Sequence, residues 1–352
     1  MIVVHIESGL GNQMLSYSEY LALRSANPHQ EFFIETIIYE IPECGEYICQ
    51  WNGYELDRIF GIDTPKNIKT LFREEEWEQI VAEVKQTEFW KHNWNYPVAI
   101  TSVLNKHGLN LKNVRGDFSI GANVKYRKND HKRSFSEIIR ESRFSNFVKR
   151  FLYRTFENKF AYRLNDKDKL FSKYEGDIFT GQWLRINYRG NGLSLVEAQM
   201  RKTFIFPPFE DSRNKEMSEY LRSVNSVAIH ARRGDMTGLL AEYYKFGYFK
   251  RAVKIIRKRV KNPVFVFFTN QGDMDWCKAN AKVFGLDFKK DVVKFVNWNA
   301  GLESYRDMQL MGFCKHAIIT PSSFGWWGSW LIDNPDKITV SPRIEMETGY
   351  HC

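Results

Sequence analysis

The chain has 352 residues, which is more than one hydrophobic core usually holds, so its length predicts two domains with a cleft between them. No run of 18 apolar residues occurs, and no basic stretch flanks the apolar start, so we expect neither a membrane-spanning helix nor a signal peptide. Five scattered cysteines argue against a disulfide framework and for reduced thiols in a cytoplasm; they are Cys44, Cys49, Cys277, Cys314 and Cys352.

The net charge of +9 is concentrated in one segment. Residues 125–169 contain 14 lysines and arginines against 6 acidic residues, with phenylalanines among them, and are expected to form an amphipathic helical segment. A segment of this kind can face solvent, an anionic lipid surface or a nucleic acid. We prefer these three alternatives in that order.

The first predicted elements are a strand, a glycine-rich turn and a helix. Residues 2–6 form a β-branched run that is typical of a buried strand. Met14, Tyr17 and Leu21 recur on one face of the helix expected after the turn. Residues 32–113 give mixed signals and support no firm assignment.

The pattern changes at Pro207 and Pro208, where we place the boundary between two domains, residues 1–207 and 208–352. Strands and helices then alternate, which predicts a parallel sheet with helices on both faces. Ligands of such sheets collect at the carboxyl ends of the strands. The expected strands are residues 227–230, 264–269, 317–320 and 338–341, and the expected helices are residues 243–260 and 304–315.

A Gly-Leu-Gly-Asn-Gln string follows the first predicted strand. Glycines let the backbone approach a ligand and leave N–H groups free for an anion at a helix start. The string is not the dinucleotide fingerprint, because Met14 stands at the third glycine position, and it has no Walker lysine. It is either a structural turn or a binding loop whose amides bond hydroxyls or fix the loop. The candidate binding residues are Gly9, Gly11, Asn12 and Gln13.

An arginine pair follows the predicted strand at residues 227–230, within the string His230-Ala-Arg-Arg-Gly-Asp235. A guanidinium can hold two phosphate oxygens and stabilise the negative charge that grows on a departing diphosphate. Because side chains alternate along an extended chain, one arginine is expected to contact phosphate. We favour Arg233 over Arg232, with the Asp235 carboxylate orienting it. The alternative is a pair of surface arginines in a turn.

A serine pair stands between the strand predicted at residues 317–320 and a tryptophan-rich helix. Ser322 and Ser323 would form an N-cap whose free N–H groups suit a phosphate or ribose oxygen. Phe324 could stack on a base. The three tryptophans that follow have the spacing of a core-facing helix, and we expect them in the core; they are Trp326, Trp327 and Trp330.

Two D-x-D strings, Asp166–Asp168 and Asp273–Asp275, match the pattern with which GT-A glycosyltransferases hold a divalent cation against a nucleotide. Matches this short arise readily in a chain with 42 acidic residues. The arginine pair already supplies positive charge. We therefore expect no metal and no other cofactor.

Three strings in the same order resemble glycosyltransferase family 11, the family of α-1,2-fucosyltransferases. The family's G-G-L-G-N-Q-M-F-Q-Y is similar to residues 8–17, and its H-x-R-R-G-D-Y is similar to residues 230–236. Its S-S-F-S-W-W-G-A-W-L is similar to residues 322–331, with Gly325 and Ser329 as the changes. The likeness is poor between Phe32 and Phe179, and weaker echoes occur further on, at residues 181–183, 274–277 and 308–311.

The resemblance implies an α/β fold of the GT-B architecture, in which two Rossmann-like domains with parallel sheets face a cleft. It implies that His230, Arg232 and Arg233 lie at the pyrophosphate of GDP-β-L-fucose. It places the serine pair and Phe324 by the nucleotide, and Gly11 and Asn12 across the cleft. Asp307 is carried over as a contact to guanine or ribose.

One departure suggests a catalytic group. Glu7 and Ser8 stand where the family usually has a small pair. A carboxylate at that strand end is well placed to be the general base of an inverting displacement, so Glu7 is our candidate base. The alternative is a glutamate that faces solvent or pairs with an arginine.

The expected activity is inverting transfer of L-fucose to a glycan hydroxyl, the 2-OH of a terminal galactose, in polysaccharide or O-antigen biosynthesis. The expected partners are a GDP-sugar, an oligosaccharide or lipid-linked acceptor and an anionic membrane surface, without nucleic acid. The expected location is the cytoplasm, at the inner face of the membrane. The alternatives are a transferase for another GDP-sugar, a basic nucleic-acid-binding protein and an inactive glycan-binding relative.

Overall fold

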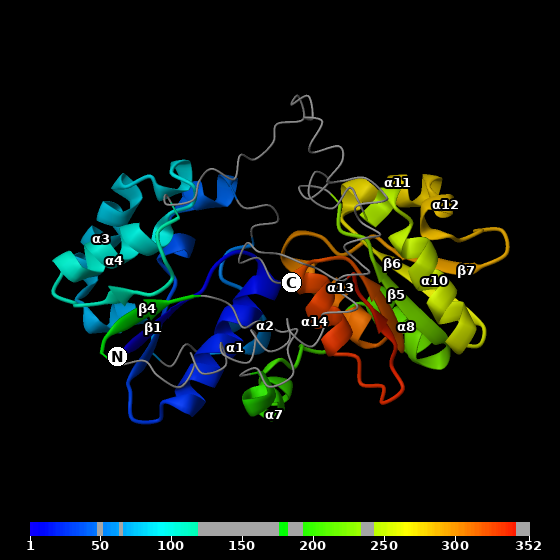
Figure 1. The fold of residues 1–352 in the computed structure, drawn as a ribbon, viewed down its shortest axis with the longest axis horizontal. Helices are drawn as coiled ribbons and strands as arrows, with labels where there is room; N and C mark the ends of the chain where they lie inside the picture. The colour runs from blue at the N-terminus through cyan, green and yellow to red at the C-terminus, as the bar shows by residue number, and fades with distance from the viewer. Residues whose placement is uncertain (48–51, 63–65, 119–175, 182–192, 234–242, 343–352) are drawn as a thin grey trace, which may run out of the picture.

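The computed structural model describes residues 1–47, 52–62, 66–118, 176–181, 193–233 and 243–342. They form two separate parallel sheets with helices packed around each, one sheet in each half of the chain (Figure 1). The arrangement confirms the predicted α/β class and the two parallel sheets of the GT-B architecture. The basic segment at residues 125–169 lies outside the described residues.

The N-terminal sheet has four strands in the order β2-β1-β4-β3, and every neighbouring pair is parallel. Its strands are β1 (Ile2–His5), β2 (Phe32–Glu35), β3 (Lys112–Asn113) and β4 (Ile178–Thr180). Its helices are α1 (Leu10–Ala26), α2 (Leu56–Phe60), α3 (Glu74–Gln86) and α4 (Tyr96–Lys106), with 3₁₀ turns η1 (Ile37–Glu40), η2 (Pro42–Glu46), η3 (Ile68–Leu71) and η4 (Phe89–Lys91).

Alternation along β1 buries both faces of this sheet. Ile2 and Val4 join a core cluster with α1, whereas Val3 joins a second cluster with α3 and α4. A strand that is apolar at every position, as β1 is up to His5, is the pattern of a parallel sheet covered on both sides.

The C-terminal sheet has five strands in the order β7-β6-β5-β8-β9, again all parallel. Its strands are β5 (Asn225–His230), β6 (Pro263–Phe268), β7 (Val292–Val296), β8 (His316–Ile319) and β9 (Thr339–Val340). Its helices are α8 (Ser212–Ser223), α10 (Tyr248–Arg259), α11 (Gln271–Ala279), α12 (Ala281–Phe284), α13 (Tyr305–Gly312) and α14 (Ser323–Trp330), with the 3₁₀ turn η7 (Gly301–Glu303). Helix α7 (Leu193–Thr203) precedes them and packs against α1 of the N-terminal half.

This sheet is also covered on both faces. Val227 and Ile229 pack in one cluster with α10 and α12, and Ala228 packs in another with α8 and α13. Every C-terminal strand and helix that the sequence predicted is present, with ends shifted by a few residues. The N-terminal strand and helix, β1 and α1, are present as well.

The two halves join through helices near the middle of the molecule, where α1 packs against α14 and α7 (Figure 1). One core cluster includes Leu10 and Met14 from α1, Phe204 after α7 and Trp327 from α14. Trp327 is fully buried, and its indole N–H donates to the carbonyl of Gly11 at 2.9 Å. The joint fixes the loop after β1 relative to the loop after β8.

The expected domain boundary at Pro207 and Pro208 lies between α7 and α8, and it stays a prediction. Among the described residues, no helix is both long and apolar enough to cross a membrane. Cys44, Cys277 and Cys314 are buried free thiols. Cys49 and Cys352 lie outside the described residues.

Candidate functional site

Each sheet has a point where its strand order reverses. In the C-terminal sheet, β6 and β7 lie on one side of β5, and β8 and β9 lie on the other. In the N-terminal sheet, β1 lies between β2 and β4 in the same way. Open parallel sheets bind ligands beyond the carboxyl ends of the strands at such a reversal. The arginine string follows β5 and the serine string follows β8, so the C-terminal reversal brings these two strings together.

His230 and Thr320 connect these two strand ends. The Thr320 hydroxyl donates to the His230 carbonyl at 3.2 Å and accepts from the Arg232 N–H at 3.2 Å. The His230 ring stacks on Phe324 with a centroid separation of 5.9 Å. A Cβ at Gly325 would collide with this ring, which explains why this helix position has no side chain.

Burial, together with the charge of Arg232, lowers the pKa of His230 to about 3. The imidazole is therefore neutral at ordinary pH. His230 can donate or accept a hydrogen bond at a pyrophosphate, but it adds no positive charge. The charge at this edge comes from the two arginines.

The Arg233 side chain is held by three neighbours. Its Nε atom lies 3.4 Å from Oδ1 of Asp273, at the start of α11. Its guanidinium carbon lies 3.5 Å from the centre of the Trp276 ring and 5.3 Å from that of Tyr244. The sequence analysis gave the orienting role to Asp235, which lies outside the described residues. The structure places Asp273 in contact with Arg233.

The starts of α1 and α14 differ in how their backbone N–H groups are satisfied. Gly9 has no side chain to cap α1, and the carboxylate of Glu55 accepts from the Leu10 N–H at 3.1 Å. Ser322 is the N-cap of α14, yet its side chain makes no capping hydrogen bond. The first turn of α14 therefore still presents N–H groups to an anion, whereas α1 has its own carboxylate.

Gln13 is fully buried and bonds the backbone of two loops. Its amide nitrogen donates to the carbonyls of Ser8 and Gly53 at 2.8 and 2.9 Å, and its carbonyl oxygen accepts from the Glu55 N–H at 2.8 Å. Of the two roles expected for the amides, this geometry gives Gln13 the fixing of loops. Asn12 is half-buried, and the described part of the chain offers its side chain no hydrogen bond.

Gly11 lies where the two halves touch. A Cβ at this position would lie 2.6 Å from the backbone nitrogen of Phe324 and 2.7 Å from the Ser323 hydroxyl oxygen. Gly11 therefore lies opposite the serine string, and its expected role in binding stays a prediction. The glycine is required for close packing of α1 on the start of α14.

Glu7 follows β1 at the reversal of the N-terminal sheet and is buried, with 4% of its surface exposed. Its two carboxylate oxygens accept from the Trp94 indole N–H at 3.2 Å and the Tyr96 hydroxyl at 3.1 Å. The Tyr96 hydroxyl in turn accepts from Nε of Arg115 at 3.1 Å. Glu7 thus neither faces solvent nor bonds an arginine directly, and its orientation is fixed.

Ser8, next to Glu7, has a backbone φ of +63°. Glycine adopts this left-handed conformation without strain, whereas serine does so at a cost. The departure from the family's glycine at this position therefore places a strained residue beside the candidate base.

Asp307 lies in the first turn of α13, at the same edge of the C-terminal sheet. Burial raises the pKa of its carboxyl to about 7, although Asn299 donates to Oδ1 at 2.8 Å. Asn299 is bonded to Asn214, whose Oδ1 accepts from the Trp298 indole at 2.8 Å. The carboxyl is thus oriented by an amide chain and can change charge near neutral pH.

The D-x-D string at the start of α11 does not bring its carboxylates together. Asp273 contacts Arg233, whereas the Asp275 side chain is 95% exposed and lies 3.5 Å from Lys278. Residues two apart on a helix face different directions. The other D-x-D string, Asp166–Asp168, lies outside the described residues. Within the described ranges, no three His, Cys, Asp or Glu side chains are grouped as metal ligands.

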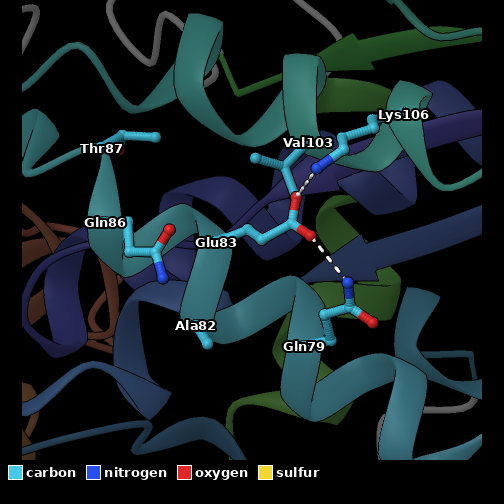
Figure 2. Close-up of a pocket in the computed structure, with 7 residues that line it drawn as sticks. All are labelled: Gln79, Ala82, Glu83, Gln86, Thr87, Val103 and Lys106. Carbon is cyan, nitrogen blue, oxygen red and sulfur yellow. Dashed lines mark hydrogen bonds and ion pairs between the residues drawn. The ribbon is translucent and has the colours of Figure 1, made fainter.

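A surface hollow of about 480 Å³ lies between α3 and α4 of the N-terminal half (Figure 2). Glu83 lies in it between Lys106 and Gln79, which donate at 2.8 and 3.0 Å (Figure 2). Its wall carries none of the predicted site residues. We assign the chemistry to the sheet edges instead.

Sequence reasoning missed the contact partners of Arg233, namely Asp273, Trp276 and Tyr244, together with Thr320. A signal existed for two of them, because Asp273 was noted as part of a metal pattern and Trp276 in a weak echo of the family. The connection to Arg233 depends on β5 and β6 being adjacent. A single sequence does not reveal that adjacency.

Comparison with known proteins gives a consistent result. Residues 211–348 match the model of Glycosyl transferase family 11. An alpha-1,2-colitosyltransferase from Escherichia coli is 29% identical over 216 residues, which is 58% of this chain and 70% of the relative. The galactoside alpha-(1,2)-fucosyltransferase 1 of Aotus azarae is 32% identical over 110 residues, 30% of this chain but 28% of the relative.

A solved structure, NodZ alpha-1,6-fucosyltransferase soaked with GDP-fucose, aligns over 96% of this chain and 94% of its own, with a TM-score of 0.42 and 13% identity. The matched residues 211–348 contain the arginine string, the serine string, Asp273 and Asp307. The predicted resemblance to glycosyltransferase family 11 is thereby confirmed, with the family match in the C-terminal half.

Proposed function

We propose that the protein transfers L-fucose from GDP-β-L-fucose to a glycan hydroxyl with inversion, without a metal ion. The acceptor position is the 2-OH of a terminal galactose in a polysaccharide or O-antigen precursor. Two relatives of this chain, a colitosyltransferase and a galactoside fucosyltransferase, are alpha-1,2 transferases, which supports this linkage. The residues on the two sheet edges support the chemistry.

One observation carries the proposal. The reversal of the C-terminal sheet brings the loop with Arg232 and Arg233 beside Thr320, in the loop that leads to α14, and the start of α14 has no side-chain cap. Guanidinium groups and uncapped helix N–H groups both stabilise a pyrophosphate. Placed together, they favour the charge that develops as the sugar–phosphate bond breaks. Glu7, at the reversal of the other sheet, would accept the proton of the attacking hydroxyl.

The colitosyltransferase relative supports a second donor. Colitose is fucose without its 3-hydroxyl, so the two GDP-sugars share the nucleotide and differ at one position of the sugar. A site that hydrogen-bonds that hydroxyl would strongly disfavour the sugar that lacks it. Turnover with GDP-fucose, GDP-colitose and GDP-mannose under the same conditions decides between the donors.

The test of the proposal is Arg233→Ala, assayed with GDP-fucose and a galactose-terminated acceptor. Loss of one preorganised donor should lower kcat by about 10²- to 10³-fold. Arg257→Ala is the matched control, because Arg257 lies on α10 and pairs with Asp291 at 2.7 Å on the protein surface. Turnover of the Arg233 variant within threefold of wild type would refute the assignment.

Metal independence is tested separately. Charge at the proposed pyrophosphate site comes from two arginines and a helix start, so a chelator should leave turnover unchanged. Loss of activity in chelator, restored by magnesium or manganese, would show that the site needs a cation.

A further inference from the structure

The nitrogen atoms of the Arg233 side chain differ in the contacts that they make. Nε contacts Oδ1 of Asp273, and one face of the guanidinium lies on Trp276. Among the described residues, neither terminal nitrogen of Arg233 has a hydrogen-bond partner. Nε thus anchors the side chain, whereas the two terminal nitrogens are left to bind two oxygens of one phosphate group.

The surface beneath Arg233 consists of aromatic rings that pack against one another. The Trp276 ring meets Tyr244 edge to face at 5.6 Å, and both rings meet Phe284 in the same manner at 6.2 and 6.4 Å. The Tyr244 hydroxyl donates to the Arg232 carbonyl at 2.7 Å, which ties these rings to the arginine string itself. Neither ring can shift without disturbing the loop after β5.

Helix geometry explains why these residues act together. Asp273 and Trp276 are three positions apart on α11 and share one face, whereas Asp275 faces solvent. Because β6 is adjacent to β5, the helix after β6 starts beside the loop after β5. The carboxylate and the ring therefore reach Arg233 from one short segment of chain.

We infer that Asp273 and Trp276 are positioning residues for Arg233. Asp273 holds its Nε and Trp276 supports the flat face of its guanidinium, so that the terminal nitrogens point at the departing diphosphate. The inference rests on the proposed function, because it assigns Arg233 to the donor pyrophosphate. An arginine has many rotamers, and a catalytic group displaced by about 1 Å can lose about 10²-fold in rate. Asp273 and Trp276 together form a cradle that restricts the rotamers of Arg233 before the donor binds.

The first experiment compares Asp273→Ala, Asp273→Asn and Asp275→Ala. Asp273→Ala should lower kcat by about ten- to hundredfold with a smaller change in donor KM, as expected when a group that acts in the transition state is misplaced. Asp273→Asn keeps an oxygen that can accept from Nε and should recover much of the loss. Asp275→Ala, two residues away on the same helix, should behave as wild type.

The second experiment uses chemical rescue, which a merely structural aspartate would not affect. In Arg233→Ala, free guanidinium at concentrations far below denaturing ones should bind on Trp276 against Asp273 and restore several-fold activity. In Arg233→Ala/Asp273→Ala the same guanidinium should restore nothing. Equal rescue of both variants, or wild-type kcat in Asp273→Ala, would overturn the inference.

The outcomes separate the inference from the proposed function. Wild-type turnover of a GDP-sugar with an unaffected Asp273→Ala variant rejects the cradle and leaves the function intact. Absence of both turnover and thermal stabilisation by GDP in the wild-type protein rejects the function, and the cradle falls with it. Thermal unfolding of each variant without ligand shows whether a loss of activity comes from a loss of folding.

Discussion

Both sheets are parallel and reverse their strand order beside their first strand, but different residue types gather at the carboxyl edges of the two sheets. The edge of the C-terminal sheet carries Arg232 and Arg233 beside a helix start that has no side-chain cap. The edge of the N-terminal sheet buries carboxylates instead, and the helix start there is already capped by one; the buried glutamates are Glu7, Glu19, Glu35 and Glu55. Each sheet thus has a reversal point, and under the proposed function the C-terminal one would stabilise the leaving group while the N-terminal one would accept the proton.

Among the variants that test these separate roles of the two sheet edges, Glu7→Gln should cause the largest loss of kcat. A glutamine keeps the volume and can still accept from Trp94, but it cannot take a proton from a hydroxyl. The kcat should fall by about 10²- to 10⁴-fold, the range of general base catalysis, whereas stabilisation by GDP should be unchanged. Turnover and GDP-dependent thermal shifts measure the two edges separately.

Glu31→Gln is the control, because Glu31 is an exposed residue of the same half that pairs with Lys66 at 2.7 Å. If Glu7→Gln keeps its kcat within a few-fold, the proton acceptor is another group or the solvent. If it loses GDP binding as well, the two edges are not independent. Either result removes the division proposed above.

Gly11→Ala tests the joint between the edges. Its Cβ would lie 2.6 Å from a backbone nitrogen of α14, which cannot rotate away as a side chain could. The two helices must separate, and we expect a loss of about 1–3 kcal/mol in the free energy of unfolding, typical of overpacking. Denaturant unfolding measures this loss, and turnover should fall with it because the edges move apart.

Gly272→Ala is the matched control for Gly11→Ala. Gly272 lies in α11, and a Cβ there would meet nothing within 4 Å. Alanine favours a helix over glycine by up to about 1 kcal/mol, so this change should leave stability equal or higher. Equal stability of the two variants would mean that α1 and α14 are not closely packed in solution.

The sequence predicted the elements well where the signal was local. The β-branched runs of β1 and β5 and the apolar spacing of α1 and α13 each identify an element from a few neighbouring residues. Strand order depends on contacts between distant segments, and it decides which loops meet. The residue patterns alone therefore gave separate strings, and the expected positions of these strings relative to each other came from the family resemblance.

Gly11 and Asp273 show why part of the site was missed. The glycine string indicated a turn or a binding loop, but the partner that requires Gly11 lies more than 300 residues away, at Ser323 and Phe324. Asp273 and Asp275 matched the D-x-D pattern of a divalent-cation site in the sequence. In the folded helix they diverge, and one of them orients an arginine from another loop.

The smallest expected effect is the pH dependence that Asp307 gives to melting temperature and to GDP affinity, and it tests the C-terminal edge. Its pKa is raised from 3.8 to about 7 by burial, so the folded protein holds this proton more tightly than the unfolded chain does. The stability that the protonated carboxyl contributes is fully present below pH 3.8 and is lost as the pH rises through about 7. Relative to Asp307→Asn, the wild-type protein should therefore lose melting temperature between pH 4 and pH 7.

Whereas the melting temperature falls as the pH rises, the affinity for guanine should increase. Guanine presents N–H donors at its Watson–Crick edge, and an ionised carboxylate accepts them, so GDP should bind wild type more tightly above pH 7 than below it. The affinity should fall by at most about tenfold for each pH unit below the pKa, because one proton must be displaced. In Asp307→Asn the affinity should be lower at high pH and nearly flat. A wild-type GDP affinity that stays constant from pH 6 to pH 8 would place Asp307 away from the base and leave its raised pKa a feature of core packing.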